Sequence, residues 1–267
     1  MLWARTTAQL ASNSNNMEYW QHQTAEKPLF PDTIWSKPET ANGSGKLLII
    51  GGSTGNMSNV AKAYALAESA GVGTISLLVP ESLRKITKQI PHIQYAPSNP
   101  SGGFAKSALA ELLDASQQKD GVLLSGDLGK NSETVILLES FLEKYGGMII
   151  ISPQSIESFA DGCSQLLLRE NTILCLNQSQ LRNLCIEIKS EYAITSQMDK
   201  PKMAKILHEL SQTFQISVMV ETNDEVWVAK NGLVADCDKT NYCSAKSGVW
   251  AIQQPEKLFQ TLVSSIV

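Results

Sequence analysis

The chain has 267 residues, of which 43% are hydrophobic and 18% charged, and its formal net charge is -4. This composition excludes bulk disorder, and the mild acidity argues against a nucleic-acid binder, which usually carries a basic stripe. No apolar run approaches the length of a transmembrane helix. The sequence therefore predicts a soluble globular protein with neither nucleic acid nor membrane as a partner, built as one α/β domain or two small ones.

The cysteines and histidines predict neither a disulfide framework nor a metal site. The chain has five cysteines, and no two of them form a C-x-x-C pair. The three histidines are scattered along the sequence without ligand partners. We therefore expect reduced thiols, a cytoplasmic protein and no bound metal ion.

Residues 1–45 are predicted to form an irregular N-terminal arm. Residues 1–16 are polar and lack the apolar core of a signal peptide, and Met17 directly after them is a candidate for the natural start. Beyond Met17, prolines and glycines interrupt three aromatic residues, Trp20, Phe30 and Trp35. We expect these aromatics to dock on the body of the protein, and the alternative is that they shape a ligand pocket.

Strands and helices alternate from residue 46 onward. Expected strands cover 46–50, 74–79, 121–125, 147–151 and 172–176, and expected helices cover 57–70, 104–117, 131–145 and 178–188, with further helical turns starting at Pro80 and Pro153. A helix over 201–213 precedes three strands, 215–220, 224–229 and 232–236, and a last helix covers 255–266. The pattern predicts a mostly parallel sheet with helices on both faces and an antiparallel meander at one edge, forming a single domain over 46–267.

Two glycine-rich turns follow expected strands and are the first candidates for a binding site. Gly51, Gly52 and Ser53 open the sequence Gly-Gly-Ser-Thr-Gly-Asn, which leads into a helix whose N-terminus can receive an anion. Its spacing matches neither the dinucleotide fingerprint nor a P-loop. The turn therefore predicts either a phosphate or pyrophosphate site, or simply a tight turn.

The second glycine turn, Gly126-Asp127-Leu128-Gly129, lies where open α/β sheets place their ligands. Its glycines allow close approach to the backbone, and Asp127 can hold a ribose hydroxyl or a metal-bound water. The alternative is a loop that only caps the helix beginning at 131. The polar loop 98–103 is of the kind that lines sites, although a surface turn is the simpler interpretation.

These features together resemble the ADP-dependent NAD(P)H-hydrate dehydratases of the ribokinase-like superfamily. The similarity rests on strand–Gly-Gly-Ser–helix, on Ala70-Gly71-Val72-Gly73 with a strand ending at Pro80, on Ser125 to Gly129, and on the polar helix start Asn131 to Thr134, and it covers roughly residues 45–236. It implies a ribokinase-like three-layer α/β/α sandwich. It also implies ADP or ATP with Mg²⁺ as cofactor and an adenine nucleotide or NAD(P)H-like compound as ligand.

The sequence departs from that family where the resemblance would place the chemistry. The family's His-Pro-Gly-Glu stretch corresponds here to Asn177 through Gln180, whose amides cannot change protonation, and its Lys-Gly corresponds to Glu221-Thr222. We find no Gly-[ST]-Gly-Asp segment, and only about 30 residues follow the meander, which we expect to be too few for the helices that normally come next.

Three functional hypotheses follow. The first is a non-catalytic nucleotide-binding or structural homologue, C-terminally truncated and forming a homo-oligomer. The second is an enzyme with re-sited chemistry on a nucleotide or NAD(P)H-hydrate-like substrate, with Asp127, Asn177, Gln180 and Glu221 lining its pocket. The third is an unrelated Rossmann-type NAD enzyme, although neither Glu68 nor Glu81 lies at the position expected for its ribose-binding acid.

Overall fold

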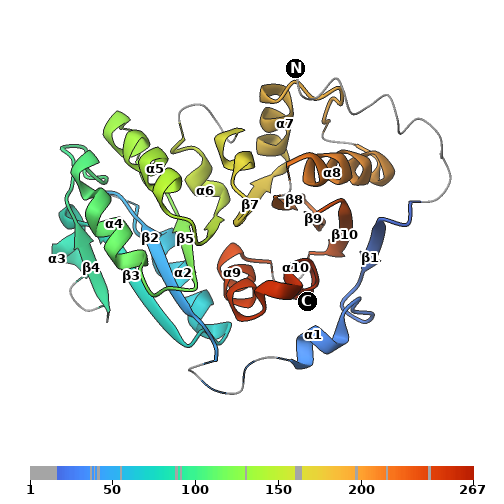
Figure 1. Cartoon of the computed structure of the whole chain (residues 1–267), viewed down its shortest axis with the longest axis horizontal. Helices are drawn as coiled ribbons and strands as arrows, with labels where there is room; N and C mark the ends of the chain where they lie inside the picture. Colours follow the sequence, from blue (N-terminus) through green and yellow to red (C-terminus); the bar gives the residue numbers. More distant parts are fainter. Residues whose placement is uncertain are drawn as a thin grey trace.

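Ten strands form one sheet in the part of the chain that the structure describes (Figure 1). This computed structural model describes residues 17–36, 38, 40, 43–54, 56–87, 90, 92–129, 131–159, 164–195, 198–214, 216–239 and 242–267. The strand order is β1-β10-β9-β8-β7-β6-β5-β2-β3-β4. The strands are β1 (Trp20–Gln23), β2 (Lys46–Gly51), β3 (Thr74–Pro80), β4 (Ile93–Ala96), β5 (Gly121–Ser125), β6 (Met148–Ile151), β7 (Thr172–Asn177), β8 (Ser217–Glu221), β9 (Glu225–Lys230) and β10 (Leu233–Asp238).

The centre of the sheet is parallel. Every neighbouring pair from β4 across to β8 runs in the same direction, and only β9 is antiparallel to its neighbours β8 and β10. The central strands are buried along almost their whole length, because helices cover both faces of a parallel sheet. The prediction of a mostly parallel sheet with an antiparallel meander is therefore confirmed.

The helices form two layers, one on each face of the sheet. One layer contains α1 (Pro31–Trp35), α2 (Ser58–Ser69), α9 (Ser244–Gln253) and α10 (Leu258–Ser264). The other contains α4 (Leu109–Ser116), α5 (Ser132–Lys144), α6 (Pro153–Ile156), α7 (Gln178–Glu187) and α8 (Lys200–Phe214), and the short helix α3 (Arg84–Thr87) lies between β3 and β4 in the chain. Figure 1 shows α9, α10 and α1 on the opposite side of the sheet from α5, α6, α7 and α8. This is the predicted three-layer α/β/α sandwich.

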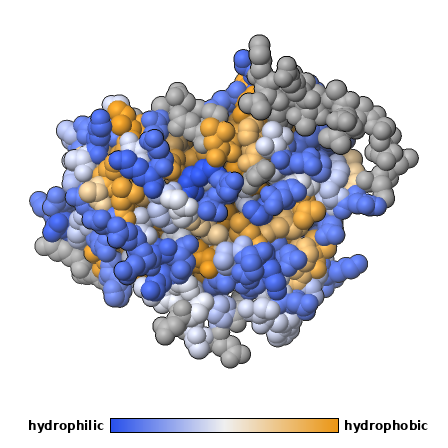
Figure 2. Space-filling model, viewed as in Figure 1, coloured by the Kyte–Doolittle hydropathy of each residue, from blue (hydrophilic) through white to orange (hydrophobic). Residues whose placement is uncertain are grey.

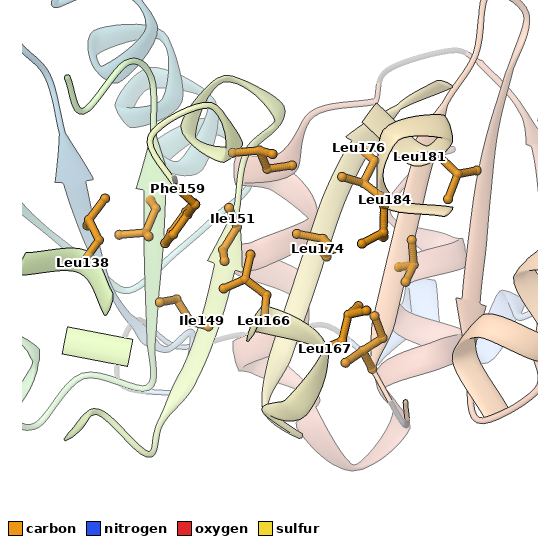
Figure 3. Packing of buried hydrophobic residues seen from close by; sticks show 14 of the residues in the cluster. Leu138, Ile149, Ile151, Phe159, Leu166, Leu167, Leu174, Leu176, Leu181 and Leu184 are labelled. Atoms are coloured by element: carbon orange, nitrogen blue, oxygen red, sulfur yellow. The ribbon is translucent and has the colours of Figure 1, made fainter. Parts of the chain in front are cut away.

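A separate apolar core lies in each of the two interfaces between sheet and helices. Figure 3 shows part of the core under α5 and α7, where Ile149 and Ile151 of β6 and Leu174 and Leu176 of β7 point toward the helix layer. All four side chains are fully buried. Burying each one contributes about 1.5–3 kcal/mol relative to leaving it exposed.

The N-terminal segment is not irregular, so that prediction is wrong for its described part. Residues 20–23 form β1, which pairs in parallel with β10, and residues 31–35 form α1. Two of the three aromatics dock as expected, because Trp20 stacks on Trp227 and Phe30 packs edge-on against Phe259. Trp35 does not dock, since 85% of it is exposed. Residues 1–16 lie outside the described residues.

Two further elements were missed or judged impossible from the sequence. No strand was expected between 80 and 120, where Ile93–Ala96 form the edge strand β4, which pairs with β3. The residues after the meander, for which we expected one last helix over 255–266 and too little chain for the family's usual helices, form both α9 and α10. The chain therefore completes the helix layer over β2, β5 and β6, because α9 contacts all three strands.

Candidate functional site

The predicted site residues all lie at one edge of the sheet. The paired positions show that β2 and β5 end together, at Gly51 and Ser125, and that β7 and β8 end together, at Asn177 and Glu221, with all four strands parallel. Because parallel strands place their carboxyl ends together, the loops after these strands meet at that edge. We call this the carboxyl edge.

The first glycine turn is required by the packing of the backbone. A side chain at Gly51 would place its Cβ 2.0 Å from the carbonyl oxygen of Ser125, so β2 and β5 can approach only with glycine there. Gly52 has φ +92°, which L side chains rarely adopt. Gly55 lies outside the described residues. The tight-turn interpretation is thus correct for Gly51 and Gly52, and the phosphate site stays a prediction.

The second glycine turn lies against the start of helix α2. Gly126 has φ +77°, and a Cβ built there would be 3.3 Å from Cβ of Asn59 and 3.9 Å from the backbone nitrogen of Val60, both in the first turn of α2. Helix α2 has no side-chain cap at its N-terminus. The two glycine turns therefore converge on a helix start whose N–H groups are available to an anion.

Asp127 shapes its own loop. Its Oδ1 accepts a 2.8 Å hydrogen bond from the backbone nitrogen of Gly129, which has φ +98°. Asn131 caps α5, since its Oδ1 accepts from the nitrogen of Glu133 at 2.9 Å. The capping interpretation of this loop is therefore correct for Asn131. Asp127 is half-buried at the edge of the candidate site.

The loop over residues 98–103 closes over both glycine turns, so it is more than a surface turn. Its backbone is joined to the first turn, because Thr54 N donates to the carbonyl of Gly102 at 3.2 Å. Asn99 is 5% exposed, and its amide oxygen accepts hydrogen bonds from Ser101 and Gly103. Its amide nitrogen donates to Thr134 at the start of α5 at 3.1 Å. Sequence reasoning missed Asn99, although the polar sequence Ser-Asn-Pro-Ser-Gly-Gly was a signal.

Asn177 and Gln180 cap helix α7. The nitrogen of Gln180 donates to Asn177 Oδ1 at 2.8 Å, and the nitrogen of Asn177 donates to Gln180 Oε1 at 2.9 Å. This reciprocal pair is a capping box. Gln180 also donates to the carbonyl of Pro153 after β6 at 2.8 Å. Gln180 therefore holds the loops after β6 and β7 together, and contact of either amide with a ligand remains a prediction.

Glu221 is paired with a lysine that the sequence did not suggest. Its Oε1 lies 2.7 Å from Nζ of Lys239, and about a third of each side chain is exposed, 33% and 35% respectively. Lys239 follows β10, which ends at the same edge as β8. A lysine therefore lies beside Glu221, at the position where the resemblance implied the loss of a cation.

A second uncapped helix start lies beside this ion pair. Helix α9 begins after Cys243, and Cys243 makes no side-chain capping bond. At the far end of α9, Gln253 donates to the carbonyl of Gly71 just after α2, at 3.1 Å. Helices α2 and α9 are in contact and run side by side in the same direction. Both therefore present their positive N-terminal ends at the carboxyl edge.

The groups around the start of α9 include two that do not exchange protons near neutral pH. Burial raises the pKa of the Cys175 thiol to about 12 and raises the pKa of Tyr242 well above its usual value. Neither is suited to acid–base catalysis. Within the described ranges, no group of three or more His, Cys, Asp or Glu residues could hold a metal ion.

Comparison with known proteins finds one curated relative and several solved structures of the same fold. No protein-family model matches the chain. Over 115 residues, 43% of the chain, it is 30% identical to the bifunctional NAD(P)H-hydrate repair enzyme of Methanocaldococcus jannaschii. The match spans only 23% of that relative's length.

None of the described helices is long and apolar enough to cross a membrane.

Solved structures show the same fold at low sequence identity. A ribokinase-like superfamily protein from Enterococcus faecalis is 12% identical, with a TM-score of 0.69 over 96% of this chain and 87% of that one. The ADP/ATP-dependent NAD(P)H-hydrate dehydratase from Bacillus subtilis, co-crystallized with ATP and Mg²⁺, is 12% identical, with a TM-score of 0.59 over 90% and 86% of the two chains. The chain therefore has the ribokinase-like fold and is related to the NAD(P)H-hydrate repair enzymes.

Proposed function

We propose that this protein binds an adenine nucleotide, or an NAD(P)H-like compound, through its phosphate groups at the carboxyl edge. The observation that carries the proposal is the convergence of the Gly51 and Gly126 turns on the uncapped start of α2. Backbone N–H groups and a helix dipole at such a position attract anions. The Bacillus subtilis relative, co-crystallized with ATP and Mg²⁺, supports the nucleotide as the class of ligand.

We further propose that binding, rather than catalysis, is the main role. The two amides aligned with the family's ionisable pair are engaged in the capping box of α7. The carboxylate of Glu221 is neutralised by Lys239. A general acid or base must change protonation near working pH, which the two amides cannot do, and the Glu221–Lys239 pair must separate before either charge can act on a ligand. Mg²⁺ would enter with the nucleotide and could be held by Asp127 together with phosphate oxygens.

The second candidate is an enzyme with re-sited chemistry, acting on a nucleotide or an NAD(P)H-hydrate-like substrate. The Glu221–Lys239 pair beside the start of α9 favours it, because a ligand could separate the pair and use each charge. An assay of NAD(P)H-hydrate dehydration with ADP or ATP tests this candidate. Turnover that Glu221→Gln abolishes would establish it.

We also propose a cytoplasmic location and self-association. Cys175, Cys185 and Cys237 are free thiols buried in the core, which is how proteins of reducing compartments use cysteine. Leu168 and Ile186 are 82% and 69% exposed. Figure 2 shows hydrophobic surface interspersed with hydrophilic residues on the viewed face. Size-exclusion chromatography with light scattering tests the oligomeric state.

Thermal unfolding with added ligands tests the binding proposal. ADP, ATP, AMP, NADH and NADPH are each added with and without Mg²⁺, and a ligand at 100 times its dissociation constant should stabilise the fold by about 2.7 kcal/mol. We expect ADP and ATP to shift the midpoint more than AMP, since two helix starts are available for two phosphates. The absence of a shift with every ligand would refute the proposal.

A charge placed at either end of helix α2 provides a matched pair of variants. Ser58 and Ser69 are exposed at the first and last positions of this helix. Ser58→Glu should stabilise the ligand-free protein by about 0.3–1 kcal/mol through the helix dipole, yet repel a phosphate and weaken nucleotide binding. Ser69→Glu should slightly destabilise the protein and leave binding unchanged. Equal nucleotide affinity in both variants would show that the phosphate binds elsewhere.

A further inference from the structure

The carbonyl oxygen of Gly102 lies against several hydrogen-bond donors beside the first glycine turn. Thr54 of that turn donates its backbone N–H to this oxygen at 3.2 Å. The hydroxyl of Ser82, in the 3-10 turn Glu81–Leu83 that follows β3, donates to it at 2.9 Å, and the hydroxyl of Thr54 donates at 3.5 Å. Three donors from two separate loops therefore converge on one oxygen atom.

This close contact requires glycine at position 102. Its φ is +82°, and a Cβ built there would lie 1.9 Å from Oγ1 and 2.6 Å from Cβ of Thr54. Ser98 holds the same loop in place, because its hydroxyl accepts from the backbone nitrogen of Ser82 at 2.7 Å. The loop over 98–103 is thus fitted directly onto the first glycine turn.

The donors around the Gly102 carbonyl are also suited to an anion. A phosphate oxygen carries more negative charge than a carbonyl oxygen and accepts hydrogen bonds about twice as strong. Thr54 and Ser82 are exposed, so a ligand can reach them from solvent. Glu81 is paired with Arg84 at 3.1 Å, which offsets its repulsion of an anion. A phosphate oxygen can therefore replace the carbonyl oxygen on these donors.

We propose that Thr54 and Ser82 form an oxyanion subsite for a phosphate oxygen, and that the Gly102 carbonyl occupies it until a ligand displaces the loop over 98–103. This inference rests on the proposed binding of a phosphate-bearing ligand at the carboxyl edge, to which it adds two binding residues and a competing loop. Each N–H or O–H group has one hydrogen to donate, so the carbonyl and the ligand exclude each other. The intrinsic affinity for the ligand is then reduced by the fraction of molecules in which the loop is open.

Gly102→Ala, compared with Gly71→Ala, tests whether the carbonyl competes with the ligand. The added methyl group would clash with Thr54 even if its hydroxyl rotates, so it pushes the loop away and leaves both donors in place. Gly71 has nearly the same φ, +85°, and no atom beyond its chain neighbours lies within 4 Å of a Cβ built there, so Gly71→Ala carries the backbone strain without the clash. We expect faster amide hydrogen exchange at Thr54 in Gly102→Ala than in Gly71→Ala. Calorimetry on the full chain should show ADP binding about three- to tenfold tighter in Gly102→Ala.

A second substitution tests the donor itself. In the Gly102→Ala background the loop is already open, so adding Ser82→Ala removes only the donor and should weaken ADP binding about tenfold. If Gly102→Ala fails to fold, Ser98→Ala frees the same loop by removing its bond to the nitrogen of Ser82, and should also tighten ADP binding.

Two results would overturn the inference, and they differ in what they say about the proposed function. Equal ADP affinity in the wild type and in Gly102→Ala, despite faster exchange at Thr54, would overturn the subsite and leave nucleotide binding intact. The absence of ADP binding to the wild type and to every variant would overturn the proposed function and the subsite together.

Discussion

Asp236 is expected to fasten the N-terminal strand to the sheet, and its replacement tests this directly. The carboxylate is fully buried in β10. Its Oδ1 accepts from Trp20 Nε1 at 2.8 Å, and its Oδ2 accepts from His22 Nδ1 at 2.8 Å and from Lys200 Nζ at 3.1 Å. Trp20 and His22 belong to β1, and Lys200 is the first residue of α8. The Asp236 carboxylate therefore joins β1 and α8 to its own strand, β10.

The size of the effect follows from these contacts. Removing one partner of a buried charged pair typically costs about 3–5 kcal/mol, because the remaining groups are left without a counter-charge. Lys200 also pairs with Glu225 and is 46% exposed, so it regains water and reduces the loss. We therefore expect Asp236→Ala to lower the free energy of unfolding by about 3 kcal/mol. Asp236→Asn keeps one acceptor oxygen, which can serve Trp20, but places an amide NH₂ group against His22 and Lys200, so it should also destabilise the fold.

Urea unfolding measures the change, and tryptophan emission shows where it occurs. Trp20 stacks on Trp227, so release of β1 should shift the emission to longer wavelength before the sheet unfolds. Asp238→Ala, at the exposed end of the same strand, is the control and should stay within about 0.5 kcal/mol of the wild type. A loss below about 1 kcal/mol for Asp236→Ala would show that this carboxylate does not hold β1.

Two further predictions concern the loops and the core. Asn99→Ala should lower the free energy of unfolding by about 2–3 kcal/mol, since five hydrogen bonds of the loop over 98–103 meet at this side chain. Urea unfolding measures the loss, with Ser101→Ala as the comparison variant. A loss within about 0.5 kcal/mol for Asn99→Ala would contradict the role of Asn99. Burial raises the pKa of Cys175 from 9.0 to about 12 and that of Cys185 to about 11. Above pH 9 the folded state therefore retains thiol protons that the unfolded chain releases. The contribution of each thiol to the free energy of unfolding is complete below pH 9 and is lost as the pH rises from 9 toward the pKa of the folded state. The loss is at most about 1.4 kcal/mol per pH unit for each thiol. Urea unfolding between pH 8 and 11 should show a shallower decline for Cys175→Ala, and an identical slope would refute the assignment.

The central strands could be located from the sequence because strands that are buried on both faces have a recognisable sequence pattern. Strands covered on both faces are continuous apolar runs, as in 121–125 and 172–176, and these were located within a residue. Strand β1 could not be found in this way, since its sequence Trp-Gln-His-Gln is mostly polar. Gln23 is fully buried, and its amide is satisfied there by donating to the carbonyl of Val263 and accepting from the nitrogen of Leu29.

Helix α9 was missed for a related reason. It contains Gly248, which normally weakens a helix, and its first turn carries small and polar residues. A Cβ at Gly248 would lie 3.2 Å from Ile150, so the small residue lets the helix pack closely on β6. That requirement comes from tertiary packing and leaves no periodic signal in the sequence.

The site could be predicted where the backbone alone determines the residue. Positive φ angles require glycine at 52, 126 and 129, and the sequence pattern identified these turns. The capping box of Asn177 and Gln180 also has a local signature, although similarity to a family suggested a ligand role instead. The pairing of Glu221 with Lys239 was inaccessible, because the meander brings together two residues that no spacing rule connects.

The carboxyl edge has two halves with different chemistry, and this limits what the protein can do. In the half formed by β2 and β5, backbone turns and the start of α2 provide uncharged donors, and Asp127 is fixed to its own turn. In the half formed by β7 and β8, the Glu221–Lys239 pair lies near the start of α9. Under the binding proposal, the first half would receive the phosphate groups of the ligand through its backbone N–H groups. Under the enzyme proposal, the ligand would also have to reach the second half and separate the Glu221–Lys239 pair. A nucleotide that binds at the glycine turns and leaves this pair intact would therefore favour binding alone.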